Sequence, residues 1–201
     1  EMITALELIM PKLEELYNTR VRHYVVKKHT LLVCEQFEKY AFAFDNKCMN
    51  MDLMRLVLAI HDIGKAIDRS TQHEHTLSLV RELWENTPFN KHELYLVEVL
   101  LRDDHLGSYF QNKYDLSDLK EEIVADATEL KMSPSILLQY KMILYQCDIA
   151  SYTKDAGGLK YLEHMFVYEN GEKAFDEDNG IIAMSEEYAD RYVNLKESIN
   201  E

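Results

Sequence analysis

The chain has 201 residues, which at roughly 150 residues per domain predicts a single domain spanning 1–201. Its 22 basic and 36 acidic residues give a formal net charge of −14 with histidine neutral. An acidic surface repels phosphate backbones, so this balance excludes a protein that coats duplex nucleic acid. A small phosphorylated ligand stays compatible with it where a cation or a local basic residue offsets the ligand's charge.

Turn-forming residues are scarce, since only 6 Gly and 3 Pro interrupt the chain. This argues against a β-sandwich or barrel with many tight turns. Apolar residues recur instead at helical spacing. In chain order the pattern predicts these helices: 3–17, 22–44, 53–64 with Gly64 as its C-terminal cap, 74–85, 91–102, 118–130, 134–151 opened by Ser133-Pro134, and 185–199.

The pattern changes after Gly157-Gly158. Two apolar segments, 165–168 and 173–175, flank Asn170-Gly171, a dipeptide typical of a two-residue hairpin turn. The sequence therefore predicts an all-α helical bundle with a small β-hairpin near the C-terminus. The hairpin and the last helix together occupy 156–201.

The cysteine content and the hydropathy pattern indicate in which cellular compartment the protein is expected. Cys34, Cys48 and Cys147 are an odd number without a CxxC pair, which indicates reduced thiols rather than a disulfide framework. No apolar run reaches the roughly 18 residues of a membrane-spanning helix. Segment 1–16 carries acidic residues among its apolar ones, unlike a signal peptide. We therefore expect a cytoplasmic protein with no membrane partner.

The segment 59–65, AIHDIGK, holds adjacent His61 and Asp62 at the end of an apolar helix. Burying an unpaired carboxylate beside an imidazole costs several kcal/mol, and a divalent cation bound by both side chains would offset that cost. A mixed nitrogen and oxygen donor set suits Mn, Fe, Co, Ni or Zn. A plain His–Asp hydrogen bond near a helix end is the simpler alternative.

Two further residues share this setting. His29 lies in KHTLLV (28–33) on an earlier helix, and Asp148 is the one acidic residue in the apolar helical segment 144–150. An aspartate that faces a core needs a cationic or metal partner, whereas a solvated Asp148 needs none. Both residues are therefore candidate metal ligands.

Together these stretches resemble the HD-domain metal-dependent phosphohydrolase superfamily, whose pattern is H…HD…D on separate helices of an all-α bundle. The resemblance covers about residues 20–155, and the four residues that match are His29, His61, Asp62 and Asp148. It implies an HD-type domain in which these side chains hold a divalent metal ion. It also implies that Asp62 and Lys65 act in catalysis, with a metal-activated water as the nucleophile.

Some branches of the superfamily bind a second metal through two additional histidines. One branch, which cleaves diadenosine tetraphosphate, is similar in the order of these residues. His105, followed by Leu106-Gly107, matches one of the two places. His73 and His75 compete for the other, and His75 is preferred because it leads into an apolar helix face. The resemblance thus implies one or two ions of Mn, Fe, Co, Ni, Zn or Mg, with solvated loop histidines as the alternative.

Lys65 and Arg102 are the candidate contacts for a substrate phosphate, although an exposed helix-end arginine is the simpler interpretation of Arg102. The predicted function is a metal-dependent phosphohydrolase acting on a nucleotide or related phosphoester. Phosphomonoesterase, phosphodiesterase and pyrophosphohydrolase activities are not distinguished. Two alternatives remain: a non-catalytic HD module that binds a nucleotide, and a di-iron redox member of the HD fold.

Overall fold

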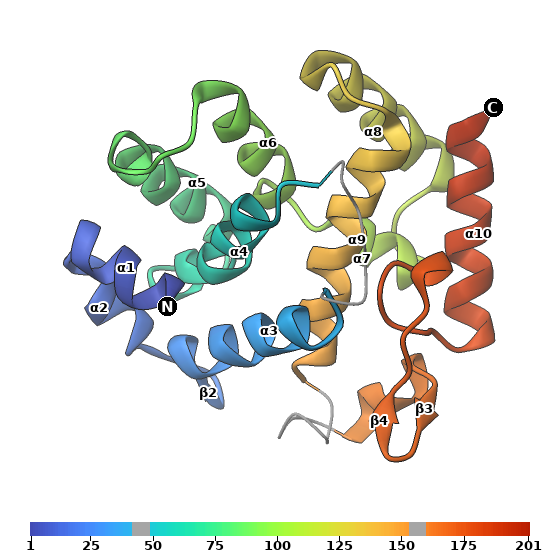
Figure 1. The fold of residues 1–201 in the computed structure, drawn as a ribbon, viewed down its shortest axis with the longest axis horizontal. Coiled ribbons are helices and arrows are strands. Elements are labelled where there is room, and N and C mark those ends of the chain that lie inside the picture. The colour runs from blue at the N-terminus through green and yellow to red at the C-terminus, as the bar shows by residue number, and fades with distance from the viewer. Residues whose placement is uncertain (42–48, 153–159) are drawn as a thin grey trace. The chain divides into compact units, whose positions relative to one another are not determined.

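A computed structural model describes residues 1–41, 49–152 and 160–201, and helices make up most of them (Figure 1). The predicted all-α class is confirmed, as is the small hairpin near the C-terminus. Contacts divide the chain into two compact units, Glu1–Glu35 with Asn50–Asp103 and Gln36–Met49 with Asp104–Glu201. The single domain over 1–201 stays a prediction. Cys48 and Gly157-Gly158 lie outside the described residues.

The first unit consists of short helices and one small hairpin. Its elements are α1 (Met2–Ile9), α2 (Lys12–Tyr17), β1 (Arg20–Val21), β2 (Tyr24–Val25), α3 (Val26–Ala41) up to Glu35, α4 (Met51–Ile60), η1 (Ile63–Ala66), α5 (Gln72–Leu83), η2 (Trp84–Asn86) and α6 (Lys91–Leu101). In Figure 1, α5 and α6 lie side by side in green, in agreement with their contacts.

Helix α4 is the most buried element of this unit. Every residue from Leu53 to Ile60 is buried except Arg55. Its start is fixed by Asn50, whose side-chain oxygen accepts a hydrogen bond from the Leu53 amide at 3.1 Å, as expected of an N-cap residue. A helix that is apolar nearly all round must lie in a core, so α4 presents its C-terminal residues from a rigid base.

Three details of the first unit differ from the sequence prediction. The predicted helix 3–17 is broken between α1 and α2 because Pro11 restricts the residue before it and lacks an amide hydrogen. The predicted helix 22–44 begins later, at Val26, because residues 20–25 form the β1–β2 hairpin. Helix α4 ends at Ile60, so Gly64 is not its cap.

Gly64 is required instead by close packing. A Cβ atom at this position would lie 2.0 Å from the carbonyl oxygen of Gln72 and 2.5 Å from Thr76 Oγ1. The Gly64 amide donates a hydrogen bond to that same hydroxyl at 3.0 Å. The absence of a side chain therefore lets η1, which carries Lys65, pack directly on the start of α5.

Trp84 directly follows the last residue of α5 and begins η2. Its indole is buried, its Nε1 donates to the Asn90 carbonyl at 2.9 Å, and its ring lies 5.8 Å from that of Phe89. Asn90 in turn caps α6 in a capping box with Glu93. The loop between the two helices is therefore tied to both of them.

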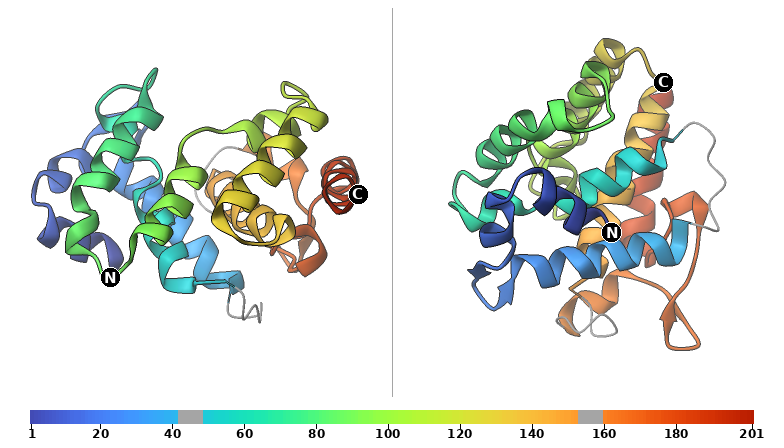
Figure 2. Two further views of the ribbon diagram at one scale, coloured as in Figure 1. Left: turned by 90° about the horizontal axis from the view of Figure 1, so that it is seen from above. Right: turned by 60° about the vertical axis from the view of Figure 1, so that its left-hand side comes forward.

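The second unit holds longer helices and the C-terminal hairpin. Besides the end of α3, its elements are α7 (His105–Phe110), α8 (Leu116–Leu130), α9 (Pro134–Ala150), η4 (Lys160–Met165), β3 (Tyr168–Glu169), β4 (Glu172–Lys173), η5 (Glu177–Asn179) and α10 (Glu186–Asn200). Figure 2 shows α8, α9 and α10 (yellow, orange and red) beside one another, and each pair is in contact.

A buried amide attaches the C-terminal segment to α9. Gln146 is 0% exposed, and its Nε2 donates to the carbonyls of Asn179 and Ile182 at 2.7 and 2.9 Å. Its Oε1 accepts from the amides of Ile181 and Ile182 at 2.9 and 3.2 Å. Full use of a buried amide's hydrogen-bonding groups stabilises this one placement of the segment, since any unmade bond would be costly.

The predicted turn at Asn170-Gly171 is present. Both residues have positive φ, 52° and 80°, as a type I′ hairpin turn requires. The strands it joins, β3 and β4, pair in register through Tyr168–Lys173 and Glu169–Glu172. They are shorter than the segments 165–168 and 173–175 predict, because Phe166 and Phe175 pair instead with Met184 and Ile182 in isolated bridges.

Candidate metal centre

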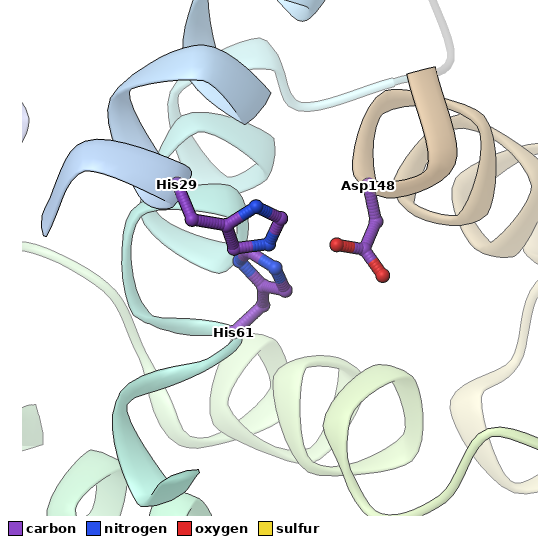
Figure 3. Close-up of side chains that lie close together, drawn as sticks. All are labelled: His29, His61 and Asp148. Atoms are coloured by element: carbon purple, nitrogen blue, oxygen red, sulfur yellow. The ribbon is translucent and has the colours of Figure 1, made fainter. Parts of the chain in front are cut away.

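Two histidines of the first unit meet at the ends of their helices. His29 lies on α3 and is 3% exposed, and His61, whose side chain is 6% exposed, is the capping residue that follows α4. Their ring centroids are 5.5 Å apart, and each offers a nitrogen within 4.8 Å of the other's. Figure 3 shows the two imidazoles close to each other. Such a pair could contribute two nitrogen ligands to one metal ion.

Asp62 places its carboxylate against both histidines. Its Oδ2 lies 3.4 Å from His29 Nε2, and its Oδ1 lies 3.9 Å from His61 Nε2. The residue is 4% exposed. Taking a carboxylate out of water costs several kcal/mol unless opposite charge and hydrogen bonds compensate it. His29, His61 and Asp62 therefore form a buried polar cluster that a divalent cation would stabilise further.

Lys65 supplies the cation in this cluster. Its Nζ lies 2.9 Å from Asp62 Oδ1, one turn of η1 further along the chain. The sequence predicts a contact between Lys65 and a substrate phosphate. The structure places the ammonium group beside the carboxylate that the same prediction assigns to the metal.

The orientation of His61 suits a metal ligand. Its Nδ1 lies 2.7 Å from the carbonyl oxygen of Leu58. A carbonyl oxygen only accepts, so in the neutral ring Nδ1 carries the proton and Nε2 carries the lone pair. Metal-binding histidines commonly donate their other ring nitrogen to a carbonyl in this way. The nitrogen nearer to Asp62 is thus the one able to bind a cation.

Tyr24 belongs to the cluster and is absent from the sequence-based set. Its hydroxyl lies 3.3 Å from Asp62 Oδ2 and 3.3 Å from Lys65 Nζ. Its ring is 5.0 Å from that of His29. The two-residue strand that carries Tyr24 is too short to give a periodic signal, and Asp62 is 38 residues away, so no sequence pattern indicated the contact.

Both candidates on α5 are half-buried, but their surroundings differ. His73 Nδ1 lies 3.0 Å from the carbonyl of Leu101, which orients its ring as Leu58 orients His61. His75 has no such orienting carbonyl among the described residues; its charge contributes only slightly to the lowered pKa of exposed Asp68, which the Ser70 hydroxyl lowers most. This geometry favours His73, although the sequence prefers His75. The assignment of either as a ligand stays a prediction.

Arg102 follows α6 as its capping residue and is half-buried. Its Nε lies 3.6 Å from Asp103 Oδ2. The pair accounts for the position of the guanidinium without a ligand, so the predicted phosphate contact of Arg102 stays a prediction.

In the second unit, His105 is the first residue of α7, beyond the end of the predicted helix 91–102. Its Nδ1 lies 2.9 Å from Glu122 Oε2 on α8, and its ring stacks on Tyr114 at 4.3 Å and 11°. Tyr114 also donates a hydrogen bond to Glu122. The imidazole and carboxylate could contribute two ligands to a metal ion. Glu122 is therefore a candidate that sequence reasoning missed.

Asp148 lies on α9 in the second unit, half-buried, and Figure 3 draws it there. Tyr145 on the same helix shows the local electrostatics. Burial raises the pKa of its phenol, and the nearby carboxylates of Asp104 and Asp148 raise it further. The ligand set of His29, His61, Asp62 and Asp148 draws on both units and stays a prediction.

Comparisons with models of protein families, with curated proteins and with solved structures found no match. Within the described ranges, no helix combines the length and the apolar character needed to cross a membrane.

Proposed function

We propose that the protein is a metal-dependent phosphohydrolase that acts on a nucleotide or a related small phosphoester. The observation that carries the proposal is the buried Asp62 carboxylate facing the Nε2 atoms of His29 and His61. Its support from the sequence is the resemblance of the same residues to the H…HD…D pattern of HD-domain phosphohydrolases.

The donor set fits a divalent ion. Two imidazole nitrogens and a carboxylate suit Mn, Fe, Co, Ni or Zn, and the Leu58 carbonyl already orients one of the nitrogens. The resemblance adds Asp148 as a further ligand. A bound ion would supply a Lewis acid that lowers the pKa of a coordinated water.

The chain's own residues have distinct tasks in this proposal. His29 and His61 bind the ion, and Asp62 binds it while compensating its charge. The Lys65 ammonium lies 2.9 Å from Asp62 Oδ1, so it stands where it can attract and orient a substrate phosphoryl group next to the ion. This local positive charge would admit an anionic substrate to a protein of net charge −14.

A second ion is part of the proposal. Its ligands would be His105 and one of His73 or His75, with Glu122 as an additional carboxylate beside His105. Two divalent ions would offset the negative charge of the carboxylates more fully than one. Metal stoichiometry distinguishes the mononuclear from the dinuclear form.

The test combines metal content with phosphate release. Wild-type protein is loaded with Mn²⁺, Co²⁺, Zn²⁺ or Mg²⁺ and assayed on a panel of nucleotides, beside Asp62→Asn. We expect Asp62→Asn to lose bound metal and at least about 100-fold of the activity, since even the loss of an outer hydrogen bond costs 10–100-fold. Asp52→Asn is the matched control, because Asp52 is an exposed residue in the first turn of α4, the helix that precedes Asp62.

Three outcomes would contradict the proposal. Phosphate release that persists in strong chelator would exclude the metal mechanism. Nucleotide binding without turnover by the metal-loaded protein would favour the non-catalytic HD module. Oxygen consumption by an iron-loaded protein without phosphate release would favour the di-iron redox alternative.

A further inference from the structure

The Tyr24 hydroxyl lies between the carboxylate and the ammonium of the cluster. It is 3.3 Å from Asp62 Oδ2 and 3.3 Å from Lys65 Nζ. Lys65 Nζ is itself 2.9 Å from Asp62 Oδ1. The three side chains therefore form a closed triangle in which each group touches the other two.

The chemistry of the groups determines the direction of each hydrogen bond. An ammonium group only donates, so Lys65 donates to the oxygen of Tyr24. An ionised carboxylate only accepts, so the phenol proton is directed to Asp62 Oδ2. Oδ2 is also the oxygen that faces His29 Nε2 at 3.4 Å. Tyr24 thus constrains the carboxylate through the oxygen nearest to a proposed metal ligand.

The β1–β2 hairpin holds Tyr24 in place. Val21 pairs with Tyr24 and Arg20 with Val25, which leaves Arg22 and His23 as the turn. Arg22 has a φ of 53°, a left-handed conformation that costs a non-glycine residue about 1 kcal/mol. Strand β1 also packs against η1, the element that carries Lys65. A strained turn next to a polar cluster is typical of a conformation retained for positioning.

We infer that Tyr24 is a positioning residue for the metal ligand Asp62. Its hydroxyl fixes the rotation of the carboxylate towards His29 and His61 and keeps the Lys65 ammonium beside it. This inference rests on the proposed function, because it takes Asp62 as a ligand. It adds a residue outside the H…HD…D pattern, supplied by an element that the sequence did not predict.

The test is titration with Co²⁺, whose visible absorption reports coordination, in wild type and in Tyr24→Phe. The substitution keeps the ring that packs on His29 at 5.0 Å and removes only the hydroxyl. We expect the dissociation constant for Co²⁺ to rise about 10-fold, the lower end of the effect of losing an outer hydrogen bond to a ligand. We also expect an altered Co²⁺ spectrum at saturation.

Tyr17→Phe is the matched control. It removes a tyrosine hydroxyl from the same unit, one that donates to the Ala59 carbonyl at 2.6 Å rather than to Asp62. Equal Co²⁺ affinity and spectrum in Tyr24→Phe and wild type would overturn the inference and leave the proposed function standing. A comparable loss of affinity in Tyr17→Phe would overturn it too, because the effect would then be general. Wild type that binds no Co²⁺ would overturn both proposals.

Discussion

Two buried polar side chains of the first unit, Asp62 and Thr30, differ in whether their polar atoms have partners. Asp62, 4% exposed, has Lys65, Tyr24 and His29 within 3.4 Å. Thr30, 1% exposed and next to His29, has a hydroxyl with no hydrogen-bond partner among the described residues. Burying an unpaired hydroxyl costs about 1–3 kcal/mol by mutational data. The protein therefore loses stability at Thr30 that it does not lose at Asp62.

Thr30→Val should raise the free energy of unfolding by about 1 kcal/mol, because valine keeps the branched shape and removes the unpaired hydroxyl. Urea denaturation followed by circular dichroism measures the change. Thr30→Ser is the control, since it keeps the hydroxyl and removes a methyl group, and it should destabilise. A Thr30→Val protein less stable than wild type would mean that the hydroxyl has a partner in solution.

The burial of candidate site residues was predictable from the sequence, whereas their contacts were not. His29 and Asp62 are buried, as the apolar residues around them on the chain suggest. Tyr24 and Glu122 were not predicted, since each contacts its partner through tertiary structure, over 38 residues for Tyr24 and Asp62 and 17 for His105 and Glu122. Local periodicity contains no information about such contacts.

Among the elements, η1 depends most directly on one residue. Gly64→Ala should destabilise the protein by about 3 kcal/mol, because the new Cβ would lie 2.0 Å from the Gln72 carbonyl, which belongs to the α5 backbone and has little room to move. The displaced η1 would also shift Asp62, the proposed ligand that directly precedes it, so Co²⁺ affinity should fall. Thermal denaturation and Co²⁺ titration measure the two effects.

Gly107→Ala is the matched control for this substitution. Its Cβ would lie 2.5 Å from Asp104 Oδ1, but Asp104 is exposed and its side chain can rotate away. Alanine is also the better helix former, by up to about 1 kcal/mol. We expect no loss of stability in Gly107→Ala. An equal change in thermal stability in Gly64→Ala and Gly107→Ala would contradict the packing role of Gly64.

The longer helices were predictable because their apolar residues recur at helical spacing, and Pro134 and Asn170-Gly171 marked boundaries that the structure confirms. The errors lie where periodicity is weak. Strands β1 and β2 have two residues each, and α7 has six, which is too few for a periodic pattern. Gly64 was predicted to cap a helix, whereas close packing against α5 requires it. Both requirements favour glycine, so the residue type alone does not distinguish them.

At the scale of the whole molecule, both units bury tyrosines. Burial raises the pKa of Tyr17 in the first unit and of Tyr145 and Tyr192 in the second. A pKa raised in the folded state contributes stability that is fully present below the unfolded pKa of about 10 and is lost as pH rises above it. The loss is up to about 1.4 kcal/mol per pH unit for each group.

We therefore expect base-induced unfolding above the ordinary tyrosine pKa, with tyrosinate absorbance and loss of helical circular dichroism appearing together. Tyr17→Phe removes one of these buried phenols. Its free energy of unfolding should therefore fall less between neutral and alkaline pH than that of wild type. Complete titration of the 13 tyrosines with the helices intact would contradict the expectation.

Trp84 is the single tryptophan of the chain, and it lies in the first unit. Its fluorescence therefore reports the unfolding of that unit alone, whereas far-ultraviolet circular dichroism reports the helices of both. Because the chain contains this internal probe, coincident or separate transitions of the two signals would show, without any added label, whether the units unfold as one cooperative body or independently.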